Sequence, residues 1–335
     1  MLNIAIVYSK TTHNYAKTSF SITDDTTKDS AIEIFNALKK KKTRPFFVPV
    51  DAQHIEKIIR NIQADCIFNL IEWTGKDLPY ALFACLLIEQ SGIPFTGATT
   101  HNFHLISDKV LMKRAFDRAK IPTPRWQTFI RGNEPIRKDF KYPIIIKPSL
   151  QHCSIGLSRD MVVDSARALQ KQVREQMRRF DEPVFAEEFI EGREFQVAVI
   201  EKDGKPVVLP PVEILFKYRG KDSYLTFESR WDEKHPDYQM SDIGLPKNMS
   251  KQLRKGIEDV CTKIFAELDY RDYMRADIRV RRDRVFVLEA NCNPGLGDDD
   301  ESAIPIAHHA VGMSFEDYIW GIVQSCLRRF GKTKR

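Results

Sequence analysis

The sequence predicts a protein of the mixed α/β (α+β) class that is divided into several domains. Its 335 residues are too many for one ordinary hydrophobic core. Strand-like and helix-like segments alternate up to residue 97, a pattern typical of βαβ units with a parallel sheet. From residue 184 onward strand-like segments dominate. These observations predict an N-terminal Rossmann-like sheet followed by a part of different architecture.

Apolar periodicity and turn residues define the elements of the first third. We expect a strand at 3–9, a helix at 30–42, a strand at 45–50, a helix at 55–62, a strand at 66–72, a helix at 78–92 and a closing segment at 93–97. The first helix should carry Ile32, Phe35 and Leu38 on one side, and the third should end at Gly92.

The remaining elements follow a different order. We expect a helix at 107–120, an extended connector at 121–126 that two prolines keep from being helical, a strand at 142–149, a helix at 165–180, strands at 184–190, 191–200, 206–214 and 225–231, a helix at 251–268, strands at 273–280 and 284–291, and a last helix at 315–329.

Composition and charge argue against several classes of protein. The longest apolar run, residues 80–88, is too short to span a bilayer, so no membrane partner is expected. The N-terminus has no features of a secretory signal, and six cysteines without a CxxC pair suit free thiols, so we expect a cytoplasmic protein. The net charge of +6 comes largely from Lys39–Lys42 and the C-terminal tail, which we interpret as solvated, with no nucleic-acid partner.

Two strands near the C-terminus bring four polar side chains together. If residues 282–284 form the turn of a hairpin, Asp277 faces Glu289 and Arg275 faces Asn291, all on one face. Two carboxylates at about 5 Å repel each other unless a cation lies between them. Two carboxylates and an amide oxygen suit Mg²⁺. A salt bridge from Arg275 or Arg279 is an equally good alternative.

The opposite face of this hairpin is expected to be apolar and to face a core. Its residues would be Ala276, Ile278, Phe286, Leu288 and Ala290.

Two further clusters carry candidate binding groups. An apolar strand delivers Lys147 to a small polar loop that ends at Gly156, which could hold phosphate or be an ordinary turn. Glu187 and Glu188 end one strand, and Glu194 opens the next. These acids could accept hydrogen bonds from a ribose or an adenine amine, or could be exposed edge charges.

Five motifs in order resemble one family. They are "SDKVLMK", "IIIKPS…SIG", "EEFIEGREF", "MRADIRV" and "VLEANCNPG". Together they resemble the ATP-grasp superfamily, and within it D-alanine–D-alanine ligase and its relatives, over residues 68–323. The resemblance implies an ATP-dependent ligase that joins a carboxylate to an amine through an acyl phosphate, with ATP between two antiparallel sheets.

The resemblance also implies domain boundaries. They are an N-terminal Rossmann-like domain at 1–98, a small central domain at 99–186, a mainly antiparallel C-terminal domain with helices at 187–330, and a basic tail at 331–335. A homodimer is a further hypothesis about the oligomeric state.

Carried over position by position, the resemblance implies the following roles. ATP would be bound by Lys109, Lys147, Ser154, Gly156, Glu187, Glu188, Ile190, Glu194 and Arg230. Two Mg²⁺ ions, or Mn²⁺ in their place, would be held by Asp277, Glu289 and Asn291. Arg275, Arg230 and Ser154 would serve catalysis.

The substrate side departs from the family pattern. The family's Gly-Gly-x-Ser start is absent, and Asp25 is the nearest candidate for its ammonium-binding glutamate. Cys153 replaces a serine, and Trp231 replaces a tyrosine. Substrate contacts would come from Asp25, Cys153, Trp231, Arg275, Gly295, Asp300 and Ser302. We therefore expect a different amino-acid or amine substrate from the D-alanine used by D-alanine–D-alanine ligase. The alternative is that the protein is the D-alanine–D-alanine ligase of cell-wall synthesis.

The acidic run 298–301 adds a hypothesis about that substrate. It could receive a cationic amine, or it could be a solvated acidic loop. An alternative of another class is a regulatory protein that binds a nucleotide without catalysing a reaction. The presence of Arg275, Asp277, Glu289 and Asn291 argues against this alternative.

Overall fold

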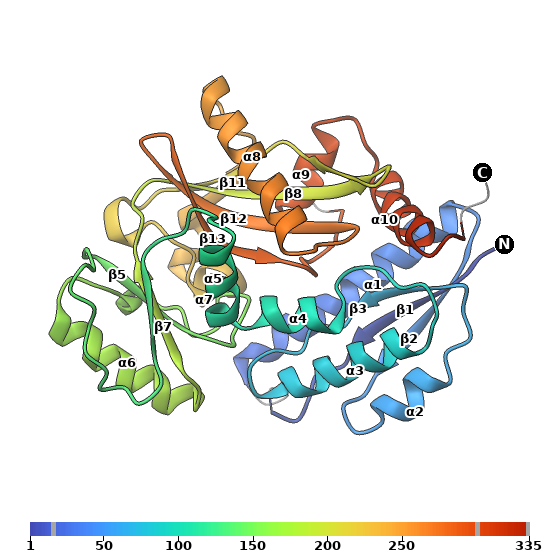
Figure 1. Cartoon of the computed structure of the whole chain (residues 1–335), viewed down its shortest axis with the longest axis horizontal. Helices are drawn as coiled ribbons and strands as arrows, with labels where there is room; N and C mark the ends of the chain where they lie inside the picture. The colour runs from blue at the N-terminus through green and yellow to red at the C-terminus, as the bar shows by residue number, and fades with distance from the viewer. Residues whose placement is uncertain (15–17, 299–301, 333–335) are drawn as a thin grey trace.

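The computed structural model describes residues 1–14, 18–298 and 302–332, with the side chains of 22–25 left undescribed. Three β-sheets form the framework, and Figure 1 shows one sheet at the N-terminal side, a small one beside it and the largest above both. None of the helices in the described residues has the length and apolar character needed to cross a lipid bilayer.

The first sheet is parallel, as the alternating pattern predicts, with strand order β2-β1-β3. Its strands are β1 (Asn3–Ser9), β2 (Arg44–Val50) and β3 (Cys66–Leu70), and its helices are α1 (Ile22–Lys40), α2 (Ile55–Arg60) and α3 (Leu78–Gln90). The helix α1 covers one face of the sheet, and α2 and α3 cover the other.

The buried face of α1 differs from the expected one. Ala31, Ile34 and Leu38 are fully or almost fully buried against the sheet. Ile32 is 42% exposed, because it lies about 100° around the helix from Ala31 and away from the sheet.

The second sheet is antiparallel and has the strand order β4-β7-β5-β6. Its strands are β4 (Trp126–Phe129), β5 (Ile144–Pro148), β6 (Val162–Val163) and β7 (Val184–Glu188). The helix α6 (Ala166–Phe180), predicted at 165–180 and capped by the Ser165 side chain, packs on one face. The strand β7 ends at Glu188, two residues beyond the predicted domain boundary at 186. The predicted domain boundaries therefore remain predictions.

The third sheet is antiparallel, with strand order β11-β10-β8-β12-β13, and β9 pairs with β8. Its strands are β8 (Arg193–Lys202), β9 (Lys205–Val208), β10 (Val212–Phe216), β11 (Ser241–Gly244), β12 (Tyr273–Arg281) and β13 (Arg284–Asn291). The helix α8 (Lys251–Glu267) packs on one face, and α9 (Ala303–His309) and α10 (Phe315–Arg329) pack on the other.

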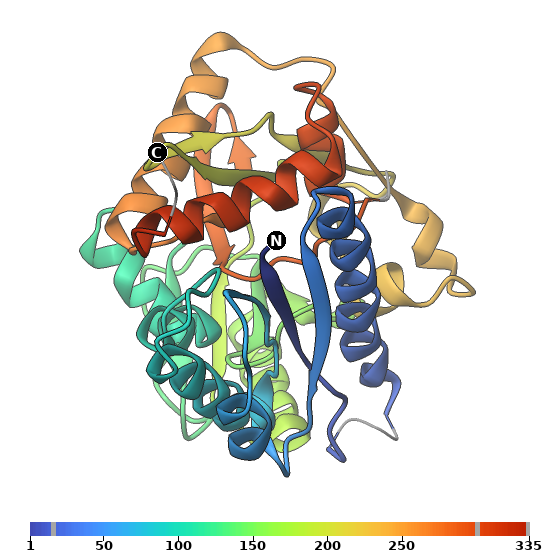
Figure 2. The same ribbon diagram turned by 90° about the vertical axis from the view of Figure 1, so that its right-hand side faces the viewer.

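The helix α10 joins the first sheet to the third. Its buried residues, which include Ile319, Ile322 and Val323, belong to one core with Phe68 of the first sheet and Tyr273 of the third. Figure 2 shows α10 crossing the molecule next to α1.

Three shorter helices lie between the sheets: α4 (Thr100–Ser107), α5 (Lys109–Arg118) and α7 (Phe227–Trp231). The last corrects a predicted strand at 225–231. Thr226 and Ser229 form a reciprocal capping box, so the local hydrogen bonds favour a helical turn over the strand that the aromatic residues suggested.

Candidate active site

The hairpin of β12 and β13 has the predicted cross-strand pairs. Arg275 lies opposite Asn291, and Asp277 lies opposite Glu289. The turn, however, has two residues, Arg282–Asp283, both with positive φ, and not the three residues expected from the sequence. The predicted pairs survive because a bulge next to Asp277 and Ile278 compensates for the shorter turn.

The bulge changes which residues of β13 face the core. Ile278 pairs with Val287, so Leu288 is the extra residue between the two registers. Val287 is fully buried in the core, whereas Leu288 lines a pocket and Phe286 is only partly buried. The expectation that Phe286 and Leu288 fill the core is therefore wrong. The bulge at Leu288 shifts the register of the preceding residues of β13, so Val287 points to the core and Phe286 points away from it.

The four hairpin groups are arranged around Asp277. The Arg275 guanidinium donates from Nε to Oδ1 of Asp277 at 2.7 Å and from Nη2 to Oδ2 at 2.9 Å. The Asn291 amide lies 3.5 Å from Oδ2 of Asp277. Burial raises the pKa of Asp277, and Arg275 opposes that shift. The salt bridge that was an alternative to a metal ion thus exists at Asp277, but no ion pair found among the described residues joins Arg275 or Arg279 to Glu289.

Glu289 faces lysines from outside the hairpin. The Nζ of Lys109, at the start of α5, lies 3.8 Å from Oε2 of Glu289. Burial alone would raise the pKa of Glu289, but Lys109 and Lys147 lower it below the usual range for a glutamate. Glu289 is therefore ionised at neutral pH.

Glu187 at the end of β7 is held by two lysines. Its carboxylate is 1% exposed and lies 2.9 Å from Nζ of Lys147 and 2.8 Å from Nζ of Lys113. Sequence reasoning missed Lys113, although it follows Lys109 by four residues in "SDKVLMK" and so lies on the same face of α5. That spacing was the signal that could have identified it.

Glu194 at the start of β8 pairs with a buried arginine. The Nη2 of Arg279 lies 2.5 Å from Oε2 of Glu194. Gln196 follows two residues later on the same face of the strand and lines the same pocket. Sequence reasoning placed Arg279 only as a partner of the hairpin acids and did not single out Gln196.

A pocket lies between the second and third sheets, and its empty space, including the solvent-filled mouth, is about 850 Å³. We call it the inter-sheet pocket. The predicted residues that line it are Lys109, Lys147, Cys153, Ser154, Glu187, Glu188, Ile190, Glu194, Arg230, Asp277 and Glu289. Gly156 does not line it. With φ +82° it lies behind the loop, where a Cβ would come within 2.8 Å of Phe180 and Pro148.

A second pocket adjoins the first and shares Gln196, Leu225 and Arg230 with it. The predicted substrate residues on its wall are Arg275, Trp231, Gly295 and Ser302. Asp29 and Glu33 of α1 and Glu72 after β3 also line this pocket, and sequence reasoning missed all three. The side chain of Asp25 and the whole of Asp300 lie outside the described residues.

The loop between β5 and β6 lines the inter-sheet pocket. Trp231 donates from its indole nitrogen to the backbone carbonyl of Cys153 at 2.8 Å, so it supports this loop. Burial raises the pKa of the Cys153 thiol to about 12, and burial with the charge of Lys109 lowers the pKa of His152 to about 4. Both groups are neutral at pH 7, so they do not form an activated thiolate–imidazolium pair.

A family model described as the D-ala D-ala ligase C-terminus matches residues 115–324, which is more than half of the chain. The chain belongs to the D-alanine–D-alanine ligase family. As a member of this family, it is an ATP-dependent ligase that forms C–N bonds. The resemblance inferred from the five motifs is confirmed.

The family's relatives cover most of this chain. Uncharacterized protein y4sG of Sinorhizobium fredii is 29% identical over 265 residues, or 79% of this chain and 75% of its own length. The D-alanine–D-alanine ligase of Cupriavidus pinatubonensis is 28% identical over 240 residues, or 71% of this chain and 69% of its own length.

The ligase fold also agrees with a solved structure. The crystal structure of D-alanine–D-alanine ligase from Bacillus anthracis complexed with ATP has a TM-score of 0.75 to this chain, at 18% identity and with 99% of both chains covered. The predicted ATP-grasp fold is confirmed.

Proposed function

We propose that this protein joins a carboxylate to an amine through an acyl phosphate, with ATP bound in the inter-sheet pocket. The observation that carries the proposal is the β12–β13 hairpin, whose carboxylates Asp277 and Glu289 line that pocket, with the Arg275 guanidinium and the Asn291 amide next to Asp277. Lysines from two other elements reach the same pocket. This arrangement combines acids that can hold a metal with cations that can hold phosphates.

The cations of the pocket support a polyphosphate site. Lys109 and Lys147 both line it, and both are almost completely enclosed. In a site with little water, such charges interact strongly with phosphate oxygens. We propose that these lysines, with Arg230 and the loop residue Ser154, hold the phosphates of ATP, and that Gly156 only lets the loop pack closely.

The inter-sheet pocket also supports a purine site. Ile190 and Leu288 give it apolar walls, and Glu187 and Glu194 give it acceptors whose positions are fixed by Lys113 and Arg279. We propose that Glu187 accepts from the adenine amine and Glu194 from the ribose, with Glu188 beside them.

The hairpin's donor set fits Mg²⁺. Asp277, Glu289 and Asn291 offer only oxygen ligands once the amide oxygen is turned inward, and Mg²⁺ prefers such ligands together with phosphate oxygens. Glu289 is already ionised because Lys109 and Lys147 lower its pKa. When bound, Mg²⁺ would neutralise phosphate charge during transfer.

The proposed reaction has two steps. A substrate carboxylate oxygen attacks the γ-phosphorus of ATP, and ADP leaves, which yields an acyl phosphate. The amine nitrogen then attacks the acyl carbon, phosphate leaves with the bonding electrons, and the nitrogen loses a proton to form the amide. Arg275, which lines the second pocket and donates to Asp277 of the first, would stabilise the negative charge that develops on the transferred group and on the acyl oxygen.

The second pocket supports a substrate that carries a positive charge. Three carboxylates of the N-terminal domain, Asp29, Glu33 and Glu72, line it together with Arg230 and Arg275. The arginines suit a carboxylate or phosphate, and the acids suit an amine. We propose a basic amino acid or a polyamine as co-substrate. The alternative, D-alanine for both substrates, is favoured by the name of the Cupriavidus relative.

Phosphate release tests these proposals. The protein is incubated with ATP, Mg²⁺ and pairs of D- and L-amino acids, dipeptides and polyamines. We expect release with at least one pair that contains a basic amine. Full activity with D-alanine alone would overturn the substrate proposal, whereas ATP binding without phosphate release from any pair would favour a regulatory protein.

A further inference from the structure

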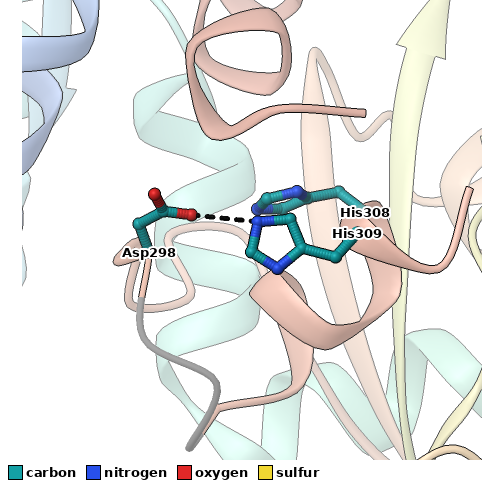
Figure 3. A group of neighbouring side chains, drawn as sticks. All are labelled: Asp298, His308 and His309. Carbon is teal, nitrogen blue, oxygen red and sulfur yellow. Dashed lines mark ion pairs between the residues drawn. The ribbon is translucent and has the colours of Figure 1, made fainter. Parts of the chain in front are cut away.

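Two histidines and an aspartate meet outside both pockets. Asp298 follows the segment after β13, and His308 and His309 end α9. One possible ligand atom from each of the three residues lies within 4.8 Å of the others. Figure 3 shows the carboxylate of Asp298 facing the two imidazole rings.

The ring of His308 is fixed in orientation and in tautomer. The residue is fully buried, and its ring stacks on Tyr318 at a centroid distance of 5.3 Å. Its Nδ1 lies 2.8 Å from the backbone carbonyl of Met313. Because a carbonyl only accepts, Nδ1 must carry the proton, and Nε2 of the neutral ring then has the lone pair that a metal ion requires.

The other two residues leave the cluster open to solvent. His309 and Asp298 are 43% and 46% exposed, and Nε2 of His309 lies 3.2 Å from Oδ1 of Asp298. Zinc ligands at 2.0–2.2 Å in a tetrahedral site are about 3.3 Å apart, so this pair already has the spacing of two ligands of one ion. An ion can reach these residues from outside.

The chemistry of the donors selects the class of ion. Two imidazole nitrogens and one carboxylate oxygen suit Zn²⁺ and similar divalent transition metals, whereas Mg²⁺ prefers oxygen ligands alone. This cluster therefore differs in metal preference from the hairpin set of Asp277, Glu289 and Asn291.

We propose that Asp298, His308 and His309 bind a divalent transition-metal ion such as Zn²⁺. The ion joins the segment after β13 to the end of α9. Gly295 and Gly297, just before Asp298, line the second pocket, as does Ser302, which immediately precedes α9. Binding of the ion therefore holds a wall of the second pocket in place.

Titration calorimetry of the full chain with Zn²⁺ tests the site, with excess Mg²⁺ present to occupy the hairpin oxygens. We expect one equivalent of Zn²⁺ to bind the wild type. His309→Ala and Asp298→Asn should each weaken binding by at least about 100-fold, since loss of even an outer partner of a metal site costs up to this factor. His101→Ala, which removes an exposed histidine of α4, is the matched control and should bind like the wild type.

Two further measurements distinguish this metal site from the hairpin acids and from a simple ion pair. Glu289→Gln should keep the same Zn²⁺ affinity, and bound Co²⁺ should give the visible spectrum of a nitrogen–oxygen site in the wild type but not in His309→Ala. If the wild type binds no Zn²⁺, or if His309→Ala binds it as tightly as the wild type, the cluster is an ion pair only and the proposal is wrong.

Discussion

Glu289 is the carboxylate on which the proposed chemistry most depends. It lies opposite Asp277 and faces Lys109, and lysine charges lower its pKa. A glutamine at this position has nearly the same shape but brings no negative charge to a metal ion.

We therefore predict that Glu289→Gln lowers kcat by about 100- to 1000-fold, a factor usual for the loss of one group that stabilises transition-state charge. Phosphate release measures the rate, and circular dichroism with thermal unfolding checks the fold. Glu201→Gln, the same change at the far end of β8, should be neutral. Undiminished turnover in Glu289→Gln would refute the metal assignment.

Glu187 shows how much one buried acid can matter to stability. It is enclosed with Lys113 and Lys147, so its removal leaves a buried lysine without its closest partner. Burial by itself raises the pKa of Glu187, but the two lysines lower it below the usual value.

We predict that Glu187→Gln lowers the free energy of unfolding by about 3 kcal/mol or more. Glu188→Gln, at the adjacent position, loses an ion pair to Arg125 at 3.4 Å, but its amide oxygen can still accept from the Lys141 N–H, so the change should cost about 1 kcal/mol or less. Urea unfolding at neutral pH measures both. Equal losses in the two variants would contradict the special role of Glu187.

The same residue predicts a pH dependence. Because the pKa of Glu187 is lower in the folded than in the unfolded state, where it is about 4.3, its contribution to stability is complete above that pH. The contribution is lost as the pH falls through the folded value. Between about pH 5 and pH 3 the wild type should lose stability more steeply than Glu187→Gln. Parallel slopes in urea unfolding would show that the pKa of Glu187 is not lowered.

At the scale of elements, the bulge in β13 decides what two neighbouring residues do. Val287 enters the core, and Leu288 enters the inter-sheet pocket. Strict alternation along the strand from the predicted three-residue turn would instead place Leu288 in the core and Val287 on the polar face.

We predict that Val287→Ala lowers the free energy of unfolding by about 2 kcal/mol through lost burial and a new cavity. Leu288→Ala should leave stability nearly unchanged and raise the KM for ATP severalfold with little change in kcat, since it removes an apolar wall. Each variant is the control for the other, measured by urea unfolding and by steady-state kinetics. The reverse pattern would mean that the strand has the unbulged register.

At the scale of the whole molecule, the second pocket is made by parts far apart in the sequence. The helix α1 supplies Asp29 and Glu33, and the third sheet and the segment after it supply Arg275, Gly295 and Ser302. Under the proposed function, the choice of substrate therefore depends on how the N-terminal sheet lies against the C-terminal one. The helix α10, packed between the two, fixes that relation.

We predict that Asp29→Asn raises the KM of a cationic co-substrate by about fivefold, the effect of one exposed charge contact of about 1 kcal/mol, and leaves the KM for ATP unchanged. Glu56→Gln, on the outer surface of α2, is the matched control. If the preference among amines is the same in Asp29→Asn as in the wild type, α1 does not select the substrate by charge.

Local sequence determined much of this protein: the parallel N-terminal sheet, the capped helix α6, and the cross-strand pairs that bring Arg275, Asp277, Glu289 and Asn291 together. Periodicity and capping are properties of a few neighbouring residues, so they can be read without the rest of the chain. Only the tertiary structure decided that Lys113 pairs with Glu187, that Leu288 faces the pocket, and that Asp29, Glu33 and Glu72 line the second one. These contacts join residues that are distant in sequence, and they depend on a bulge and on the packing of three sheets, which no local pattern records.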